Sequence, residues 1–186
     1  MFDSGFGGLT VARAVIDLLP EEDLVYIGDT GRYPYGPRPQ AEVLAFAREL
    51  AWSLVHDHGA KLVVVACNTA AAAGLHVIEE ELPVPVVSVV EPGTRSLVAA
   101  TRTGRVGVIG TVGTIGSGAY QDAVAATGVD VALTAVACPG FVEFVERGET
   151  AGEGVTILAE QGCTELFTLM DEYVAVAPPL RPPARA

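Results

Sequence analysis

The chain has 186 residues, of which 50% are hydrophobic and 18% are charged, and its formal net charge is −12. This balance supports a packed core and excludes global disorder. The acidic charge repels nucleic-acid phosphates and anionic lipids, so we expect neither nucleic acid nor a membrane as a partner. The sequence has no apolar run near the roughly 20 residues that span a bilayer, and no signal-peptide pattern.

The three cysteines are odd in number and far apart along the chain. Cys67, Cys138 and Cys163 therefore have neither the spacing of a metal site nor that of a disulfide framework. We expect a soluble protein of the reducing cytoplasm in which these cysteines do not bind a metal.

Short apolar runs alternate with stretches of helical periodicity along the chain. The expected strands span residues 24–27, 62–66, 84–90, 106–109 and 131–137. The expected helices span residues 9–19, 41–58, 70–81, 94–100, 118–126 and 141–147. Strands that are almost continuously apolar and alternate with helices predict an α/β fold of two open, mostly parallel sheets flanked by helices.

Both ends of the chain differ from this pattern. A first strand should precede Asp3, yet only Met1 and Phe2 stand before it. Residues 175–186 are rich in Ala, Pro and Arg, and this proline density predicts a disordered tail. We therefore expect an incomplete fold, truncated at both ends, with a first domain at 1–92 and a partial second domain at 93–174.

Small polar groups are expected at the carboxyl ends of the strands, where open α/β sheets bind their ligands. These ends carry Asp3-Ser4-Gly5, Gly28-Asp29-Thr30, Cys67-Asn68-Thr69, Glu91-Pro92-Gly93, Gly110-Thr111 and Cys138-Pro139, and Tyr33-Pro34-Tyr35-Gly36 follows the second of them. We expect these groups to converge on one edge.

Cys67 stands where a buried strand meets a helix. A helix N-terminus favours the thiolate and lowers the pKa of a free cysteine from about 8.5, which would suit a nucleophile, a metal ligand or a general base. The alternative is a buried structural cysteine. Asn68 and Thr69 favour the functional interpretation because they add hydrogen-bonding side chains at the same point.

The other candidates also have simpler explanations. Asp3 and Ser4 could bind an amino or carboxylate group, or they could cap the following helix. Tyr35 and Gly36 could form a plain turn. The histidines fall on expected helices and are interpreted as surface residues: His56, His58 and His76.

Several motifs follow one another in a fixed order. The first are Asp3-Ser4-Gly5-Phe6-Gly7-Gly8-Leu9, Gly28-Asp29-Thr30, Pro34-Tyr35-Gly36 and Ala66-Cys67-Asn68-Thr69-Ala70. The later ones are Glu91-Pro92-Gly93, Gly107-Val108-Ile109-Gly110-Thr111, Ala137-Cys138-Pro139 and Phe141-Val142-Glu143. In this order the sequence resembles the glutamate racemases of the aspartate/glutamate racemase group, from residue 2 to about residue 148.

The resemblance implies a cofactor-independent enzyme that interconverts L- and D-glutamate and supplies D-glutamate for peptidoglycan. In that family a pair of cysteines flanks the substrate α-carbon, and one removes a proton while the other returns one to the opposite face. Cys67 matches the first of the pair. The positions that hold the substrate match Asp3, Ser4, Tyr35, Gly36, Asn68 and Thr69.

The resemblance weakens at the second cysteine. The family has a Gly-Cys-Thr-His segment there, whereas this chain has Gly162-Cys163-Thr164 followed by Glu165. Cys138 does not match the second catalytic position and is interpreted as structural. The alternatives are another amino-acid racemase of the same family, an inactive truncated relative, and a pseudo-enzyme that binds a protein partner. A homodimer is the assembly considered.

Overall fold

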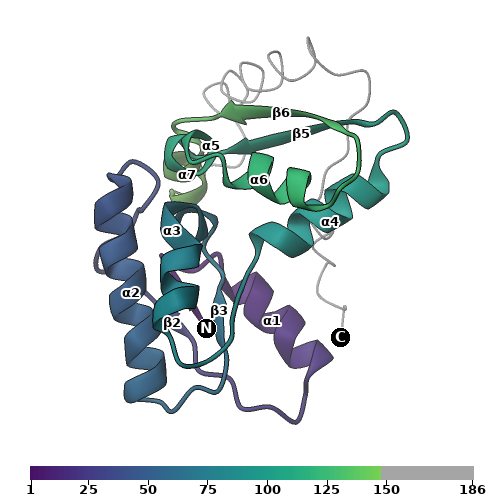
Figure 1. The fold of residues 1–186 in the computed structure, drawn as a ribbon. Helices are drawn as coiled ribbons and strands as arrows, with labels where there is room; N and C mark the ends of the chain where they lie inside the picture. The colour runs from purple at the N-terminus through teal and green to yellow at the C-terminus, as the bar shows by residue number, and fades with distance from the viewer. Residues whose placement is uncertain (148–186) are drawn as a thin grey trace, which may run out of the picture.

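The computed structural model describes residues 1–147, which form two parallel sheets (Figure 1). The first sheet has four strands in the order β2-β1-β3-β4, and the second pairs β5 with β6. The strands are β1 Phe2–Asp3, β2 Ile27–Gly28, β3 Val63–Val65, β4 Val86–Ser88, β5 Arg105–Gly110 and β6 Ala132–Ala137. The helices are α1 Leu9–Leu18, α2 Gln40–His56, α3 Asn68–Glu81, α4 Val90–Ala100, α5 Val112–Gly116, α6 Ala119–Ala126 and α7 Phe141–Glu146. The expected α/β fold with two parallel sheets is confirmed.

Helices cover both faces of the first sheet. Successive side chains of a strand point to opposite faces, so Val63 and Val65 join a core with α2 and α3, whereas Val64 packs in a separate cluster with Ala12 of α1. Figure 1 shows the same arrangement, with α1 across the strands from α2 and α3. Burial on both faces of the sheet explains why the residues of β3 are all apolar.

The first strand is shorter than the sequence pattern demands. β1 consists of Phe2 and Asp3 alone, yet it lies in the middle of the sheet between β2 and β3. Phe2 is 0% exposed and pairs with Ile27 on one side and Val65 on the other. Asp3, which the sequence pattern placed just after the strand, is the second of its two residues.

The connection between the two sheets also differs from expectation. β4 ends at Ser88 and α4 begins at Val90, so Glu91-Pro92-Gly93 occupies the first turn of a helix instead of a loop at a strand end. A proline is tolerated in a first helical turn, and an acidic residue there interacts favourably with the helix dipole. The domain boundary proposed at 92/93 falls within this turn, and the proposed tail at 175–186 lies outside the described residues.

Helix α5 is absent from the sequence-based prediction. It spans only Val112–Gly116, and its two glycines disfavour a helix by about 1 kcal/mol each. The side chain of Thr111 caps it by accepting a hydrogen bond from the backbone N–H of Thr114 at 3.2 Å. The cap offsets part of this weak propensity.

Helix α3 is kinked at Gly74, where φ is 149°. A side chain there would be strained, and a Cβ atom would also lie 3.1 Å from the Leu44 side chain of α2. The kink thus allows α3 and α2 to pack closely. Within residues 1–147, no helix is long and apolar enough to cross a membrane.

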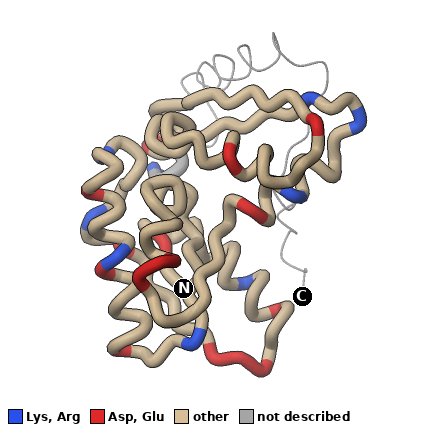
Figure 2. The backbone as a smooth tube through the Cα atoms, in the orientation of Figure 1, with Lys and Arg blue, Asp and Glu red and all other residues tan. Residues whose placement is uncertain are grey.

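Acidic residues are distributed over both halves of the molecule, as Figure 2 shows. Helix α1 and its neighbouring loops, in contrast, expose large apolar side chains. Phe6 is 64% exposed and Leu18 is 77% exposed, and they are accompanied by Leu9, Ile16 and Leu19. Exposed apolar side chains that gather on one helix and its neighbouring loops can promote association.

We therefore predict that the purified chain self-associates, with a homodimer as the smallest assembly. Sedimentation velocity over a range of concentrations measures this directly. Replacing Ile16 and Leu18 with Ser should shift the distribution toward monomer, because it removes exposed apolar area without touching the core. A monomer that persists at every concentration and melts in one sharp transition would contradict the prediction.

Candidate active site

The end of β3 lies beside the end of β1, and this brings the thiol to the first loop. The backbone N–H of Ala66 donates to the carbonyl oxygen of Phe2 at 2.9 Å. Cys67 follows as the N-cap of α3, and its sulfur accepts a hydrogen bond from the N–H of Ala70 at 3.4 Å. The thiol donates to the Ser4 hydroxyl at 3.4 Å. Cys67 and Ser4 therefore lie at the same edge of the sheet, as expected.

Asp3 organises the loop between β1 and α1. One of its carboxylate oxygens accepts hydrogen bonds from the backbone N–H groups of Gly5, at 3.1 Å, and Gly8, at 3.0 Å. A Cβ atom at Gly8 would lie 2.7 Å from the Cβ of Asp3, so only glycine permits this approach. The N-cap of α1 is Gly8 and not Asp3 or Ser4, so the simple capping interpretation of these two residues is wrong.

Tyr35 is buried, with 1% of its surface exposed, and its hydroxyl does not face solvent. It donates to a carboxylate oxygen of Asp29 at 2.5 Å, and the Nε of Arg32 donates to the same oxygen at 2.6 Å. The backbone N–H of Asp29 in turn donates to the carbonyl of Asp3 at 3.0 Å. Burial and the Asp29 carboxylate raise the pKa of Tyr35, so the phenol stays protonated and anchors its loop to β1.

Thr69 forms a cluster of hydroxyl groups with the second half of the chain. Its Oγ1 lies 3.2 Å from the Oγ1 of Thr111 and 3.3 Å from the Oγ1 of Thr114. Gly36 packs against the same segment, because a Cβ atom there would lie 2.9 Å from a methyl carbon of Thr111. Residues from both halves of the chain therefore meet at Thr69, two positions after Cys67.

Two of these threonines were not assigned by sequence reasoning. Thr111 was recognised only as a residue at a strand end, and Thr114 was missed. The signal for Thr111 was its position after β5, since ligands gather at such ends. Thr114 joins the cluster only because α5 forms and turns its side chain toward Thr69.

Asn68 is exposed, and its side chain also contacts the second half of the chain. The hydroxyl of Tyr120, in α6, donates to its carbonyl oxygen Oδ1 at 2.8 Å. The structure thus brings Cys67 together with Ser4, Thr69 and Asn68. Asp3 and Gly36 hold the adjoining backbone, whereas the Tyr35 hydroxyl is bound to Asp29.

Burial raises the pKa of the Cys67 thiol above the ordinary value of a cysteine. The negative charge of Asp3 acts in the same direction, and the hydrogen bonds of the sulfur with Ser4 and with the N–H of Ala70 only partly oppose these effects. The sequence analysis expected a lowered pKa and was wrong here. The cost of removing a thiolate from water exceeds the stabilisation that the start of a helix provides.

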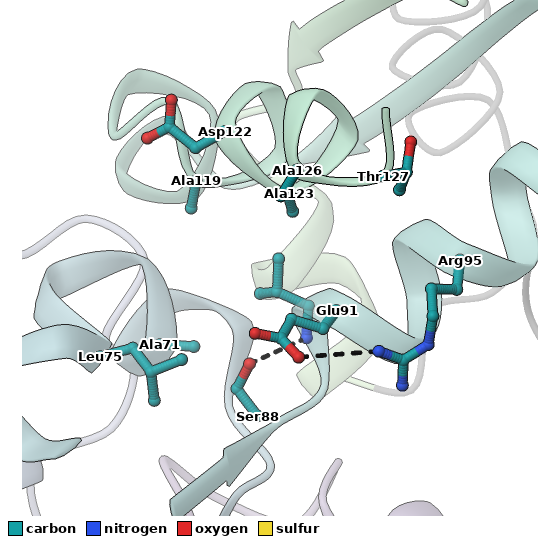
Figure 3. Close-up of a pocket in the computed structure, with 11 residues that line it drawn as sticks. Ala71, Leu75, Ser88, Glu91, Arg95, Ala119, Asp122, Ala123, Ala126 and Thr127 are labelled. Atoms are coloured by element: carbon teal, nitrogen blue, oxygen red, sulfur yellow. Dashed lines mark hydrogen bonds and ion pairs between the residues drawn. The ribbon is translucent and has the colours of Figure 1, made fainter. Parts of the chain in front are cut away.

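A separate cavity of about 470 Å³ lies between α3, α4 and α6 (Figure 3). Its wall is mostly apolar and includes Ala71, Leu75 and Ala123, and Glu91 forms a 3.7 Å ion pair with Arg95 at its rim. Cys67 does not line it, and none of its described lining residues is a cysteine or a histidine. The thiol cluster therefore remains the better candidate for chemistry.

Within residues 1–147, no group of three or more His, Cys, Asp or Glu side chains is placed to hold a metal ion. The polar groups at this edge are a thiol, hydroxyls, an amide and one carboxylate. Such a set can move a proton and orient a small polar ligand.

Residues 10–171 match the Asp/Glu/Hydantoin racemase family, and the chain belongs to that family. It is 59% identical over 160 residues to a glutamate racemase from Mycobacterium ulcerans, a match that covers 86% of this chain and 58% of that protein. The chain thus spans little more than half the length of the relatives it matches.

Solved structures show the same similarity. A glutamate racemase isoform from Bacillus anthracis superposes with a TM-score of 0.81 at 43% identity, over 89% of this chain and 62% of that one. The glutamate racemase from Francisella tularensis, solved in complex with D-glutamate, superposes with a TM-score of 0.80 at 34% identity, over 89% and 61% of the two chains.

The raised pKa of Cys67 predicts how its reactivity depends on pH. Only the thiolate reacts with iodoacetamide, so the rate of alkylation at Cys67 should rise about tenfold per pH unit and continue rising above about pH 8.5. Mass spectrometry of the Cys67 peptide measures this rate, with glutathione in the same solution as the reference. A Cys67 rate that levels off at lower pH than the glutathione rate would contradict the raised pKa.

Proposed function

We propose that this chain is a glutamate racemase in its chemistry, with Cys67 as the acid–base group for one face of the substrate. The observation that carries the proposal is the buried Cys67 thiol, hydrogen-bonded to Ser4 at a sheet edge where residues of both halves meet. The family match and the relatives named glutamate racemase support glutamate as the substrate and D-glutamate for peptidoglycan as the product.

In this proposal the substrate is held by Asp3, Ser4, Asn68 and Thr69 and by the backbone around Tyr35 and Gly36. The Cys67 thiolate removes the α-proton, and the electron pair of the broken C–H bond is delocalised into the neighbouring carboxylate. Hydroxyl and amide donors stabilise the charge that develops there. No cofactor takes part.

The raised pKa of Cys67 sets a condition on this mechanism, because a neutral thiol cannot take a proton. The α-ammonium group of an amino acid bound beside the sulfur would favour the thiolate, as an opposite charge within about 4–6 Å does. We therefore propose that the substrate itself activates the base.

The two free cysteines in the described part of the chain, Cys67 and Cys138, fit a reducing cytoplasm.

Inversion also needs an acid on the opposite face of the α-carbon. The candidate for the family's second cysteine is Cys163, which lies outside the described residues and is followed by Thr164 and then Glu165, where the family has a histidine. Each acid–base group contributes about 10²–10⁴-fold in rate. We therefore propose that exchange of the α-proton on one enantiomer exceeds racemisation.

The test follows α-proton exchange in D2O by NMR, separately for L- and D-glutamate, and racemisation by chiral chromatography. We expect exchange on one enantiomer, little racemisation, and loss of exchange in Cys67→Ala. Cys138→Ala is the matched control and should keep the exchange. Racemisation at a normal enzymatic rate that is lost in Cys163→Ala would contradict the one-sided proposal and identify the second acid.

An inactive relative that only binds its ligand is the second candidate, and the burial of Cys67 as a neutral thiol favours it. Binding of glutamate without exchange at any pH would establish this candidate instead. Exchange with aspartate in preference to glutamate would indicate another amino-acid racemase of the family.

A further inference from the structure

Tyr120 connects the two halves of the molecule at the residue that follows the thiol. It lies in the first turn of α6, and Asn68 is the first residue of α3, 52 positions earlier in the sequence. The ring of Tyr120 packs against the core of the first half while its hydroxyl donates to Oδ1 of Asn68 at 2.8 Å. Neither the sequence motifs nor the resemblance assigned a role to this tyrosine.

The direction of this hydrogen bond decides which end of the amide is available to a ligand. An asparagine side chain has one carbonyl acceptor and one NH2 group with two donors. Burial raises the pKa of Tyr120, so its phenol keeps the proton that it donates. With Oδ1 occupied by that proton, the Nδ2 donors are the groups that Asn68 can offer to a ligand beside Cys67.

We propose that Tyr120 is a positioning residue that fixes the Asn68 amide with its N–H donors presented to a carboxylate of the ligand. The role rests on the proposed function, because it assumes an anionic amino acid at the Cys67 edge. Asn68 is exposed, so a ligand can reach it. If the amide rotated by half a turn, Oδ1 would face the carboxylate and repel it.

The arrangement also makes ligand binding depend on the packing of the two halves. The amide donor proposed to face the ligand belongs to α3, whereas the hydroxyl that orients it belongs to α6 in the second half of the chain. Thr69 shows a parallel connection, since its hydroxyl lies within 3.3 Å of Thr114 in the second half. Tyr120 differs from Thr69 because it acts on Asn68 through its hydroxyl alone. A substitution with Phe removes that hydroxyl and keeps the ring.

The test uses Tyr120→Phe, which removes the hydroxyl and keeps the ring that packs in the core. Calorimetry with the full 186-residue chain measures the Kd for each enantiomer of glutamate. We expect Tyr120→Phe to weaken binding about tenfold, the value of one well-placed hydrogen bond. In an Asn68→Ala background the same change should have no further effect, because the residue through which it acts is gone.

A merely structural role would not produce this dependence on Asn68. The side-chain amide signals of Asn68, identified in 15N NMR spectra by their loss in Asn68→Ala, should shift in Tyr120→Phe without ligand. Unchanged signals, an unchanged Kd, or equal losses in both backgrounds would overturn the role of Tyr120. An unaltered chain that binds neither enantiomer would instead overturn the proposed function, and the amide signals would still decide the orientation of Asn68.

Discussion

The pairing of β1 with β3 is the interaction on which the candidate site depends. β1 contains only Phe2 and Asp3, and Phe2 is held in the middle of the sheet by strands on both sides. The bond from the Ala66 N–H to the Phe2 carbonyl aligns the ends of the two strands. Without it, Ser4 and Cys67 would be parts of separate loops, because nothing local in the sequence connects positions 63 residues apart.

A second constraint is the conflict between burying a thiol and ionising it. Cys67 is only 6% exposed, and its pKa is raised in spite of its hydrogen bonds with Ser4 and with the N–H of Ala70. A protein can accept this cost when a ligand supplies the missing positive charge, because a dry site then strengthens every interaction with the reacting group. A cysteine with no catalytic role could be buried in the same way. A catalytic role requires a ligand whose positive charge favours the thiolate of Cys67.

Support for the site comes from both halves of the chain. Asp29 fixes Tyr35 and reaches Asp3 through its backbone, which joins the loops of the first sheet. Thr111, Thr114 and Tyr120 then contribute hydroxyl groups from the second half. The candidate site is therefore a property of how two small sheets pack, which is why changes at α6 are expected to affect a ligand bound at α3.

The spacing of apolar residues predicted a helix or strand correctly where burial of the segment's own side chains determines its structure. The apolar run at 62–66 predicted β3, and the helical spacing of Val43, Ala47, Leu50 and Leu54 predicted α2 within two residues at each end. It failed for α5, where a threonine cap offsets weak propensity, and for Glu91-Pro92-Gly93, which resembles a loop but begins a helix. Propensity contains no information on the partner that stabilises such a segment.

The sequence by itself determined the α/β class, the order of the elements apart from α5, and most of the chemical groups at the strand ends, because these follow from periodicity and residue type. The tertiary structure decided which of those groups meet and in what state. It committed the Tyr35 hydroxyl to Asp29, added Thr114 to the cluster, and raised the pKa of Cys67. These outcomes depend on distance and burial, which are set by contacts between residues far apart in the chain.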